Sequence, residues 1–300
     1  MSVDLNPIYV VDSHAHPPRK GVPGVDERPY IAPKTEEERE LRFEEDLAEV
    51  IMDMDTRGVN RKVMLAMPQD IEPAFHFGEQ LECGLMTYTS QQWIAKAVAL
   101  YPERFSACAC LNPLEESSIA ELEDLKQQGF CEVKIHQAHY NIMANDKRAY
   151  PFYRECARLG FPVAFHTGFS SVRHIDRFVP TRPDALDDLA YDIPDLKINM
   201  CHAGGNWYQD GVMIAMRNEN IVVDLAGLPY ICNRMVCPKL DPAELIYRIC
   251  ELLGPERVMF GTDNMDDEMN LAFMQSIGLS DSALRMVMGQ SAMQFLEIRE

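Results

Sequence analysis

The 300-residue sequence lacks two features that would place it in or across a membrane. No uncharged apolar run reaches the roughly 18 residues that a bilayer-spanning helix needs. The N-terminus, MSVDLNP, has neither the basic segment nor the long apolar segment of a secretory signal peptide. We therefore expect a soluble, cytoplasmic protein with no membrane partner.

Basic residues are scarce, and cysteine motifs are missing. Lys and Arg number 28 against 47 Asp and Glu, which gives a net charge of -19. Such a chain does not neutralise phosphates, so nucleic-acid binding is not expected, and an anionic substrate would need local Arg or Lys. The nine cysteines include no Cys-x-x-Cys pair, and their odd number fits a reducing compartment better than a disulfide framework.

What the sequence does have is a regular alternation of short apolar runs with amphipathic segments. The runs predict strands and the segments of helical period predict helices. The predicted strands are 8–12, 62–66, 105–111, 131–136, 162–166, 197–202, 221–225 and 257–263. The predicted helices are 41–57, 91–101, 118–128, 149–159, 209–217, 242–253 behind an N-cap at Asp241, and 281–297.

Eight strands separated by helices predict an α/β protein with a distorted (β/α)8 TIM barrel. An open sheet is the alternative, but it would gather function at one switch point, whereas the polar residues here follow many strands. No linker divides the chain, so we expect one domain over residues 1–300, with the last helix packed outside the ring. The long connections 17–40 and 69–88 follow strand ends and are either lids or plain insertions.

Metal-binding residue types stand at the predicted strand ends. The first strand runs into His14 and His16, and a spacing of two puts both on one side of an extended chain. Two imidazoles that converge at a strand end are a metal-binding pattern. Later strands end at Lys134, His136, His166, His202 and Asp263. Because all carboxyl ends of barrel strands open on one face, we expect these residues to converge.

The motifs HAH, KIH, FHTG, CHAGG and GTD follow one another in this order. The pattern resembles the amidohydrolase superfamily, specifically its amidohydrolase-related branch, from residue 8 to about residue 297. That branch contains decarboxylases such as aminocarboxymuconate-semialdehyde decarboxylase, together with hydratases and lactone hydrolases. The resemblance implies a barrel enzyme with a small-molecule substrate, and it does not name that substrate.

The resemblance also implies one divalent metal ion, held by His14, His16, His166 and Asp263. Zinc is most frequent in such enzymes and manganese is an alternative; three neutral imidazoles and a carboxylate suit either. His202 would be the acid/base residue, a role that Asp263 could share. In two-metal members a carbamylated lysine on the fourth strand bridges the ions. We favour the single-metal interpretation, in which Lys134 binds substrate.

Three further residues are candidates for substrate contact. His136 should point the same way as Lys134. Arg173 follows FHTG, where a guanidinium could bind a substrate carboxylate with two hydrogen bonds. Trp207 follows CHAGG and could form a wall of the pocket. The plain alternatives are a solvated arginine and a tryptophan engaged in helix packing.

Two reaction classes fit this set of residues. The first is hydrolysis of a lactone, amide or related bond in a carboxylated substrate by a metal-activated water, which we favour slightly. The second is non-oxidative decarboxylation or hydration of an aromatic or muconate-type acid with the same groups. A third hypothesis, a non-catalytic metal-binding barrel, is opposed by the complete set of ligand types. Relatives often dimerise, so a homodimer is an open expectation.

Overall fold

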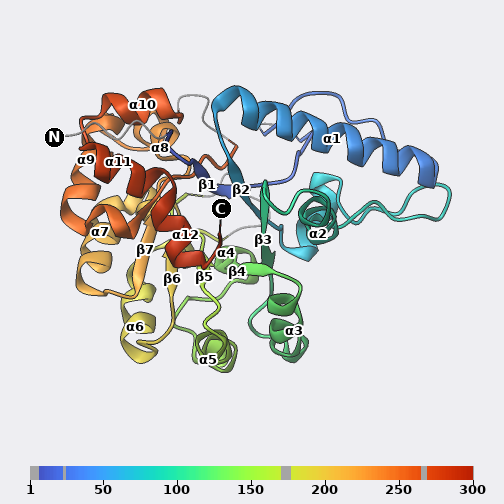
Figure 1. The fold of residues 1–300 in the computed structure, drawn as a ribbon. Helices are drawn as coiled ribbons and strands as arrows, with labels where there is room; N and C mark the ends of the chain where they lie inside the picture. Colours follow the sequence, from blue (N-terminus) through green and yellow to red (C-terminus); the bar gives the residue numbers. More distant parts are fainter. Residues whose placement is uncertain (1–6, 23–24, 170–176, 265–268, 300) are drawn as a thin grey trace.

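The computed structural model describes residues 7–22, 25–169, 177–264 and 269–299 of the chain. Within them, eight strands form one parallel sheet in the order β1 to β8, alternating with helices (Figure 1). The strands are β1 Val11–Ala15, β2 Arg61–Leu65, β3 Phe105–Cys110, β4 Phe130–Ile135, β5 Val163–Phe165, β6 Ile198–Met200, β7 Ile221–Asp224 and β8 Val258–Met259. The predicted (β/α)8 architecture is confirmed.

Hydrogen bonds between the first and last strand segments draw the sheet into a nearly closed ring. The Ser13 N–H donates to the Phe260 carbonyl at 2.9 Å, and the Asp263 N–H donates to the His14 carbonyl at 2.7 Å. The first strand begins three residues later than predicted. The eighth is shorter than the predicted 257–263, because the Phe260 N–H donates to the Val287 carbonyl and the Thr262 N–H to the Asp12 side chain. Asp263 and Asn264 then turn into left-handed backbone with φ of 54° and 55°.

Helices surround the strands. They are α1 Glu36–Arg57, α2 Ser90–Leu100, α3 Glu116–Gln127, α4 Gln137–Tyr140, α5 Tyr150–Leu159, α6 Asp184–Asp192, α7 Tyr208–Arg217, α8 Leu228–Arg234, α9 Pro242–Leu253, α10 Leu271–Ser276, α11 Asp281–Arg285 and α12 Ser291–Leu296. The helix α1 begins five residues before its predicted start, because the Thr35 side chain caps it by accepting from the Glu38 N–H. The short helices α6, α8 and α10 were not predicted. The Asp241 cap of α9 is confirmed.

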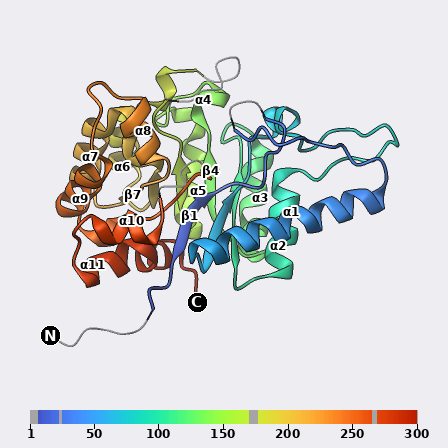
Figure 2. The ribbon, with the colours of Figure 1, turned by 90° about the horizontal axis from the view of Figure 1, so that it is seen from above.

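The C-terminal segment lies across the amino-terminal end of the barrel rather than beside the outer helices. It runs through α11, a π-helical turn at Met286–Gln290 and α12. Gly289 passes so close to the first strand that an added Cβ would lie 2.2 Å from the Tyr9 carbonyl oxygen. Ala292 and Leu296 pack against the apolar side chains that fill this end, Val11, Val63, Leu65, Cys108, Cys131, Val222 and Met259. Figure 2 shows α4, which follows β4, at the opposite end of the barrel from α11.

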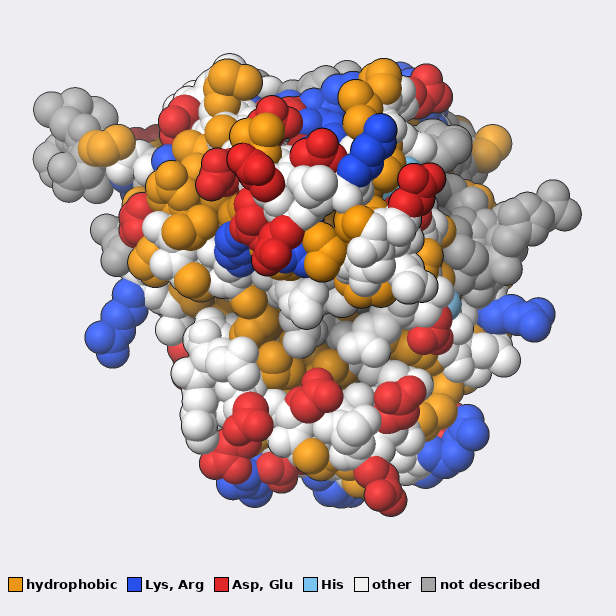
Figure 3. Space-filling view, turned by 90° about the vertical axis from the view of Figure 1, so that its right-hand side faces the viewer, with side chains coloured by type: hydrophobic (Ala, Val, Ile, Leu, Met, Phe, Trp, Pro, Cys, Tyr) orange, Lys and Arg blue, Asp and Glu red, His pale blue; other side chains and the backbone are white. Residues whose placement is uncertain are grey.

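The outer surface carries charges of both signs. Figure 3 shows acidic, basic and apolar side chains interspersed over the face seen from the right of Figure 1. Among the described residues, no helix is both long and apolar enough to cross a bilayer.

Candidate metal centre

The ends of β1 and β8 bring three predicted ligands together. His16 Nε2 lies 3.3 Å from Asp263 Oδ1, and His14 Nε2 lies 3.8 Å from the same oxygen. Both histidines are buried, at 1% and 9% exposure. Residues that are about 250 positions apart in sequence therefore meet at one point, as the strand-end pattern predicts.

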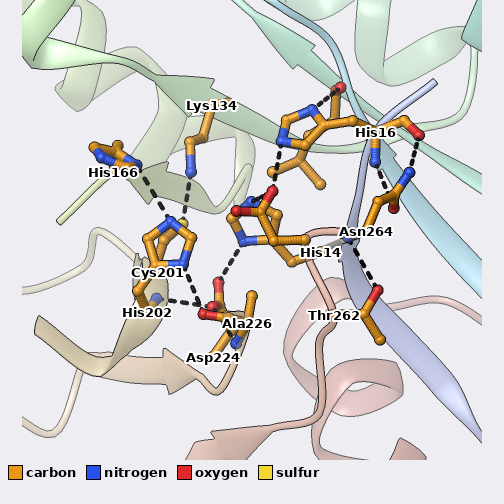
Figure 4. Close-up of polar contacts among 12 residues, drawn as sticks. His14, His16, Lys134, His166, Cys201, His202, Asp224, Ala226, Thr262 and Asn264 are labelled. Atoms are coloured by element: carbon orange, nitrogen blue, oxygen red, sulfur yellow. Dashed lines mark hydrogen bonds and ion pairs between the residues drawn. The ribbon is translucent and has the colours of Figure 1, made fainter. Parts of the chain in front are cut away.

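His202 and His166 extend this cluster on the other side. One ligand atom from each of His14, His202 and Asp263 lies within 4.8 Å of the other two. His202 Nε2 also lies 3.2 Å from His166 Nδ1 (Figure 4). The His166 ring stacks on His136 at a centroid distance of 4.6 Å. His202, which we predicted as the acid/base residue, thus lies within reach of the same ion as His14 and Asp263. The predicted ligand His166 lies next to His202.

The second nitrogen of each central imidazole is anchored. His14 Nδ1 pairs with Asp224 Oδ2 at 3.0 Å, His16 Nδ1 with the Leu65 carbonyl at 2.9 Å, and His202 Nδ1 with the Ala226 carbonyl at 2.8 Å. Acceptors at Nδ1 fix the tautomer in which Nε2 keeps its lone pair, the form that binds a metal.

The donor set fits a divalent first-row ion. His166 presents Nδ1 to the cluster, 3.2 Å from His202 Nε2, and its buried Nε2 has no hydrogen-bond partner among the described residues, so the ring has a nitrogen to offer an ion. Neutral imidazoles and one carboxylate are the donors that zinc and manganese sites use. The residues present therefore match the group that the sequence pattern implies.

The protonation states of these residues also suit a divalent metal ion. Burial lowers the pKa of His14 to about 4, although the Asp224 charge partly opposes it, and burial also lowers the pKa of His16 and of His166. Burial alone would raise the pKa of Asp263. The hydrogen bond to His16 and the nearby histidines outweigh burial, so its pKa lies well below the usual range. At neutral pH the imidazoles are uncharged and the carboxylate is ionised, as metal binding requires.

Asp224 has a structural role at the site that the sequence analysis did not assign. Its Oδ2 pairs with His14, and its Oδ1 accepts from the backbone N–H groups of His202 and Ala226 at 2.8 and 3.2 Å. One carboxylate thus orients an imidazole from β1 and the turn that carries His202. The signal for this role is its place at the end of the seventh strand, in IVVDLAG.

Glycines allow the FHTG and CHAGG turns to touch. An added Cβ on Gly205 would lie 2.4 Å from Gly168 Cα, so neither position has room for a side chain. Thr167 ties the turns together, since its Oγ1 donates to the Cys201 carbonyl at 2.5 Å and accepts from the Gly204 N–H at 3.1 Å. His202 itself has a left-handed φ of 63°, which aims its ring at the centre.

Lys134 lies beneath the cluster as a buried cation. Its side chain is held by Cys201, with Nζ 2.8 Å from Sγ, and the residue is 3% exposed. Burial alone would lower its pKa, but the effects of the neighbouring Cys201 and Asp224 are larger and opposite, so the pKa of Lys134 lies above its usual value. Carbamylation needs the neutral amine, so this environment favours the single-metal interpretation.

A cavity of about 270 Å³ opens beside the centre. Both long connections contribute to its wall, Arg19 and Val25 from the first and Ile71 and Phe75 from the second. The remaining polar lining includes Lys134 and His136, and the apolar lining includes Met67, Phe169 and Ile231. The cavity therefore combines apolar surface with a few cationic and metal-binding groups, as small-molecule sites do.

Trp207 does not line this cavity. Its ring packs against Phe178 at a centroid distance of 5.0 Å and against the Arg182 guanidinium at 5.2 Å, so the packing alternative describes it better. Arg173 lies outside the described residues. Arg19 does line the cavity, yet no motif marks it; the available signal is a basic residue three positions after His16.

The chain has counterparts among known protein families and solved folds. The family model described as Amidohydrolase matches residues 11–296. A search of curated proteins finds no match.

Solved structures with similar folds include a decarboxylase, a hydratase and a putative hydrolase. One is 5-carboxyvanillate decarboxylase from Novosphingobium aromaticivorans, complexed with manganese (15% identity, TM-score 0.63, 96% of each chain covered). Another is 4-oxalomesaconate hydratase from Rhodopseudomonas palustris (16%, 0.64, 96% of each chain). A third is a putative 2-pyrone-4,6-dicarboxylic acid hydrolase from Pseudomonas putida (15%, 0.63, 98% of this chain and 100% of that one). At these identities the likeness shows the fold alone.

Proposed function

Because the chain belongs to the amidohydrolase family, we propose that it is a metal-dependent enzyme acting on a small carboxylated compound. One divalent ion, zinc or manganese, would be held by His14, His16, His166 and Asp263. The observation that carries the proposal is the convergence of His14 and His16 Nε2 on Asp263, while acceptors anchor the opposite ring nitrogens. When bound, the ion would supply a Lewis acid that holds and polarises substrate oxygens.

Lys134 and His136 are the groups for substrate recognition in the proposal. Both line the cavity, and Lys134 presents an ammonium that pairs with a carboxylate. The buried position strengthens that pairing, because little water competes for the charges. Arg173 remains a candidate for a second contact.

Among the family reactions, we favour non-oxidative decarboxylation. Much of the cavity wall is apolar, formed by residues such as Met67, Phe75, Phe169 and Ile231. A carboxylate whose charge spreads into a ring as its C–C bond breaks is helped by such surroundings. In this reaction His202 would first take up a proton from solvent at Nε2 and then donate it to the ring carbon; the C–C bond breaks, its electron pair stays with the ring and carbon dioxide leaves. His202 is placed for this by the Ala226 carbonyl, which holds its other nitrogen.

Hydrolysis is the second candidate, and a neighbouring cavity favours it. A charged cavity of about 360 Å³ adjoins the site and shares Arg19, Val25 and Asn264 with it. Because these residues line both cavities, the charged cavity would be the source of the attacking water. In this reaction His202 would accept a proton from the attacking water.

Metal reconstitution with product analysis tests the proposal. The chelated protein is reloaded with zinc or manganese and assayed on aromatic carboxylates and on carboxylated lactones. We expect activity only after reloading, at about one ion per chain, with carbon dioxide released from a carboxylate. Acid release from lactones without carbon dioxide would establish hydrolysis instead. Turnover that survives chelation, or a requirement for two ions, would contradict the proposal.

A further inference from the structure

We infer that Arg19 determines specificity by binding a second anionic group of the substrate, in addition to the one near Lys134, so that the preferred substrate carries two acidic groups. This inference rests on the proposed function and adds a substrate class to it. Arg19 lies in the connection after β1, at the wall between the catalytic cavity and the charged side cavity. Its guanidinium therefore stands beside the place where substrate would lie.

The first argument is that Arg19 lacks a binding partner of its own. Among the described residues its guanidinium carbon lies 5.9 Å from the centre of the Phe75 ring, and its charge interacts with those of Asp263 and Asp26 and with His16. The Arg19 carbonyl accepts from the Val22 N–H, but the guanidinium makes no hydrogen bond or close ion pair with the part of the chain that the structure describes. The guanidinium is half-buried and lines the cavity, and no acceptor of the described chain engages its N–H groups, so they are open to an acceptor that arrives with a ligand.

Other arginines show what a structural role looks like in this protein. Arg61 donates to the Pro102 and Phe105 carbonyls and to Ser106 Oγ. Arg257 donates to the carbonyls of Leu253, Ala215 and Asn218. These guanidiniums hold backbone segments together, and Arg19 does not.

The second argument concerns charge. Burial lowers the pKa of Arg19, and the nearby Asp263 and Asp26 oppose this, but a guanidinium stays charged at any physiological pH. Asp263 is a proposed metal ligand, so its negative charge would offset part of the ion's charge once the site is filled. Arg19 would then lie beside a centre of net positive charge, and an anionic group of the substrate would neutralise this excess positive charge.

The third argument is the arrangement of the cavity. Lys134 and Arg19 both line the cavity, Lys134 as a buried side chain held by Cys201 and Arg19 as a half-buried one in the connection after β1. A flat, largely apolar body with one acidic group toward Lys134 and another toward Arg19 uses both cations and the apolar surface between them. The fork of a guanidinium matches a carboxylate with two parallel hydrogen bonds.

Binding of two probes to the metal-loaded protein, measured by calorimetry, tests the inference. The probes are isophthalate and 3-carbamoylbenzoate, which differ by one carboxylate replaced by a neutral amide. The variants are Arg19→Met and Arg19→Lys, with Arg28→Met as the matched control. Arg28 lines only the side cavity and is already paired with Asp26 and Glu49.

We expect the wild type to bind isophthalate at least about tenfold more tightly than 3-carbamoylbenzoate, the range of a charge-assisted bidentate pair. Arg19→Met should lose this preference, Arg19→Lys should keep part of it, and Arg28→Met should match the wild type. The inference fails if Arg19→Met keeps the preference, if it weakens both probes equally, or if the wild type shows no preference. Metal content, measured in parallel, separates these failures from failure of the proposed function, in which the wild type would not retain an ion.

Discussion

The imidazoles of the centre differ in what holds their second nitrogen. His14 faces a carboxylate, that of Asp224, whereas His16 and His202 face backbone carbonyls. A carboxylate partner makes an imidazole a stronger electron donor than a carbonyl partner does. Of these three rings, His14 is therefore the one whose metal binding should depend most on a neighbouring side chain, that of Asp224.

Replacing Asp224 by Asn should weaken metal binding by about 10- to 100-fold, the usual effect of losing such a partner. The amide keeps the shape of the side chain but removes the charge that orients and polarises His14. Competition with a chelator of known affinity measures the change. Asp241→Asn, a conservative replacement at the cap of α9, is the control and should bind metal like the wild type. An unchanged affinity in Asp224→Asn would show that Asp224 does not support His14.

At the scale of elements, the contact between the turns after β5 and β6 sets the position of His202. Gly205→Ala would drive a methyl group into Gly168 Cα at 2.4 Å, so the turns must separate. Gly58, the C-cap of α1, has a similar φ of 69° but nothing within 4 Å of an added Cβ.

We predict that Gly205→Ala lowers the free energy of unfolding by about 2 kcal/mol more than Gly58→Ala does. Gly58, with a ψ of 28°, has left-handed backbone that alanine can adopt at a cost, whereas Gly205, with a ψ of −128°, has backbone that only glycine favours and also has the clash. Urea unfolding measures the difference. Gly205→Ala should also weaken metal binding, through displacement of the neighbouring turn. Equal losses in the two variants would mean that the turns accommodate a side chain.

The same turns explain what the sequence could and could not predict. Strand order and helix positions follow from apolar periodicity, and residues at strand ends converge because a barrel places those ends on one face. The orientation of His202 depends on left-handed backbone, which periodicity does not encode. The packing of Trp207 and the exposure of Arg19 to the cavity depend on how long connections fold, and no local pattern specifies that.

For the whole molecule, buried titratable groups couple folding to pH. Burial lowers the pKa of His14 to about 4 and that of His136 to about 3, and it lowers those of His16 and His166 as well. Below their ordinary value of 6.5 the unfolded chain takes up protons at these positions and the folded chain does not. Burial raises the pKa of Glu132 to about 8, which acts in the opposite sense.

Burial also raises the pKa of Asp12 and of Glu72, which act like Glu132. Four histidines outweigh these three carboxyl groups, so the metal-free protein should lose stability as the pH falls from about 7 toward 4. Each net proton is worth about 1.4 kcal/mol per pH unit. Urea unfolding of the chelated protein at pH 7 and pH 5 tests this, with the midpoint expected to fall. A midpoint that is equal or higher at pH 5 would contradict the assignment of neutral, buried imidazoles.

The central claim is that His14, His16, His166 and Asp263 hold one divalent ion, and metal analysis tests it most directly. Protein exposed to zinc or manganese and then desalted should retain about one equivalent per chain. A His14→Ala, His16→Ala double variant should retain almost none, while His76→Ala, whose ring stacks on Tyr30 instead, should match the wild type. Retention of a full equivalent by the double variant would contradict the account.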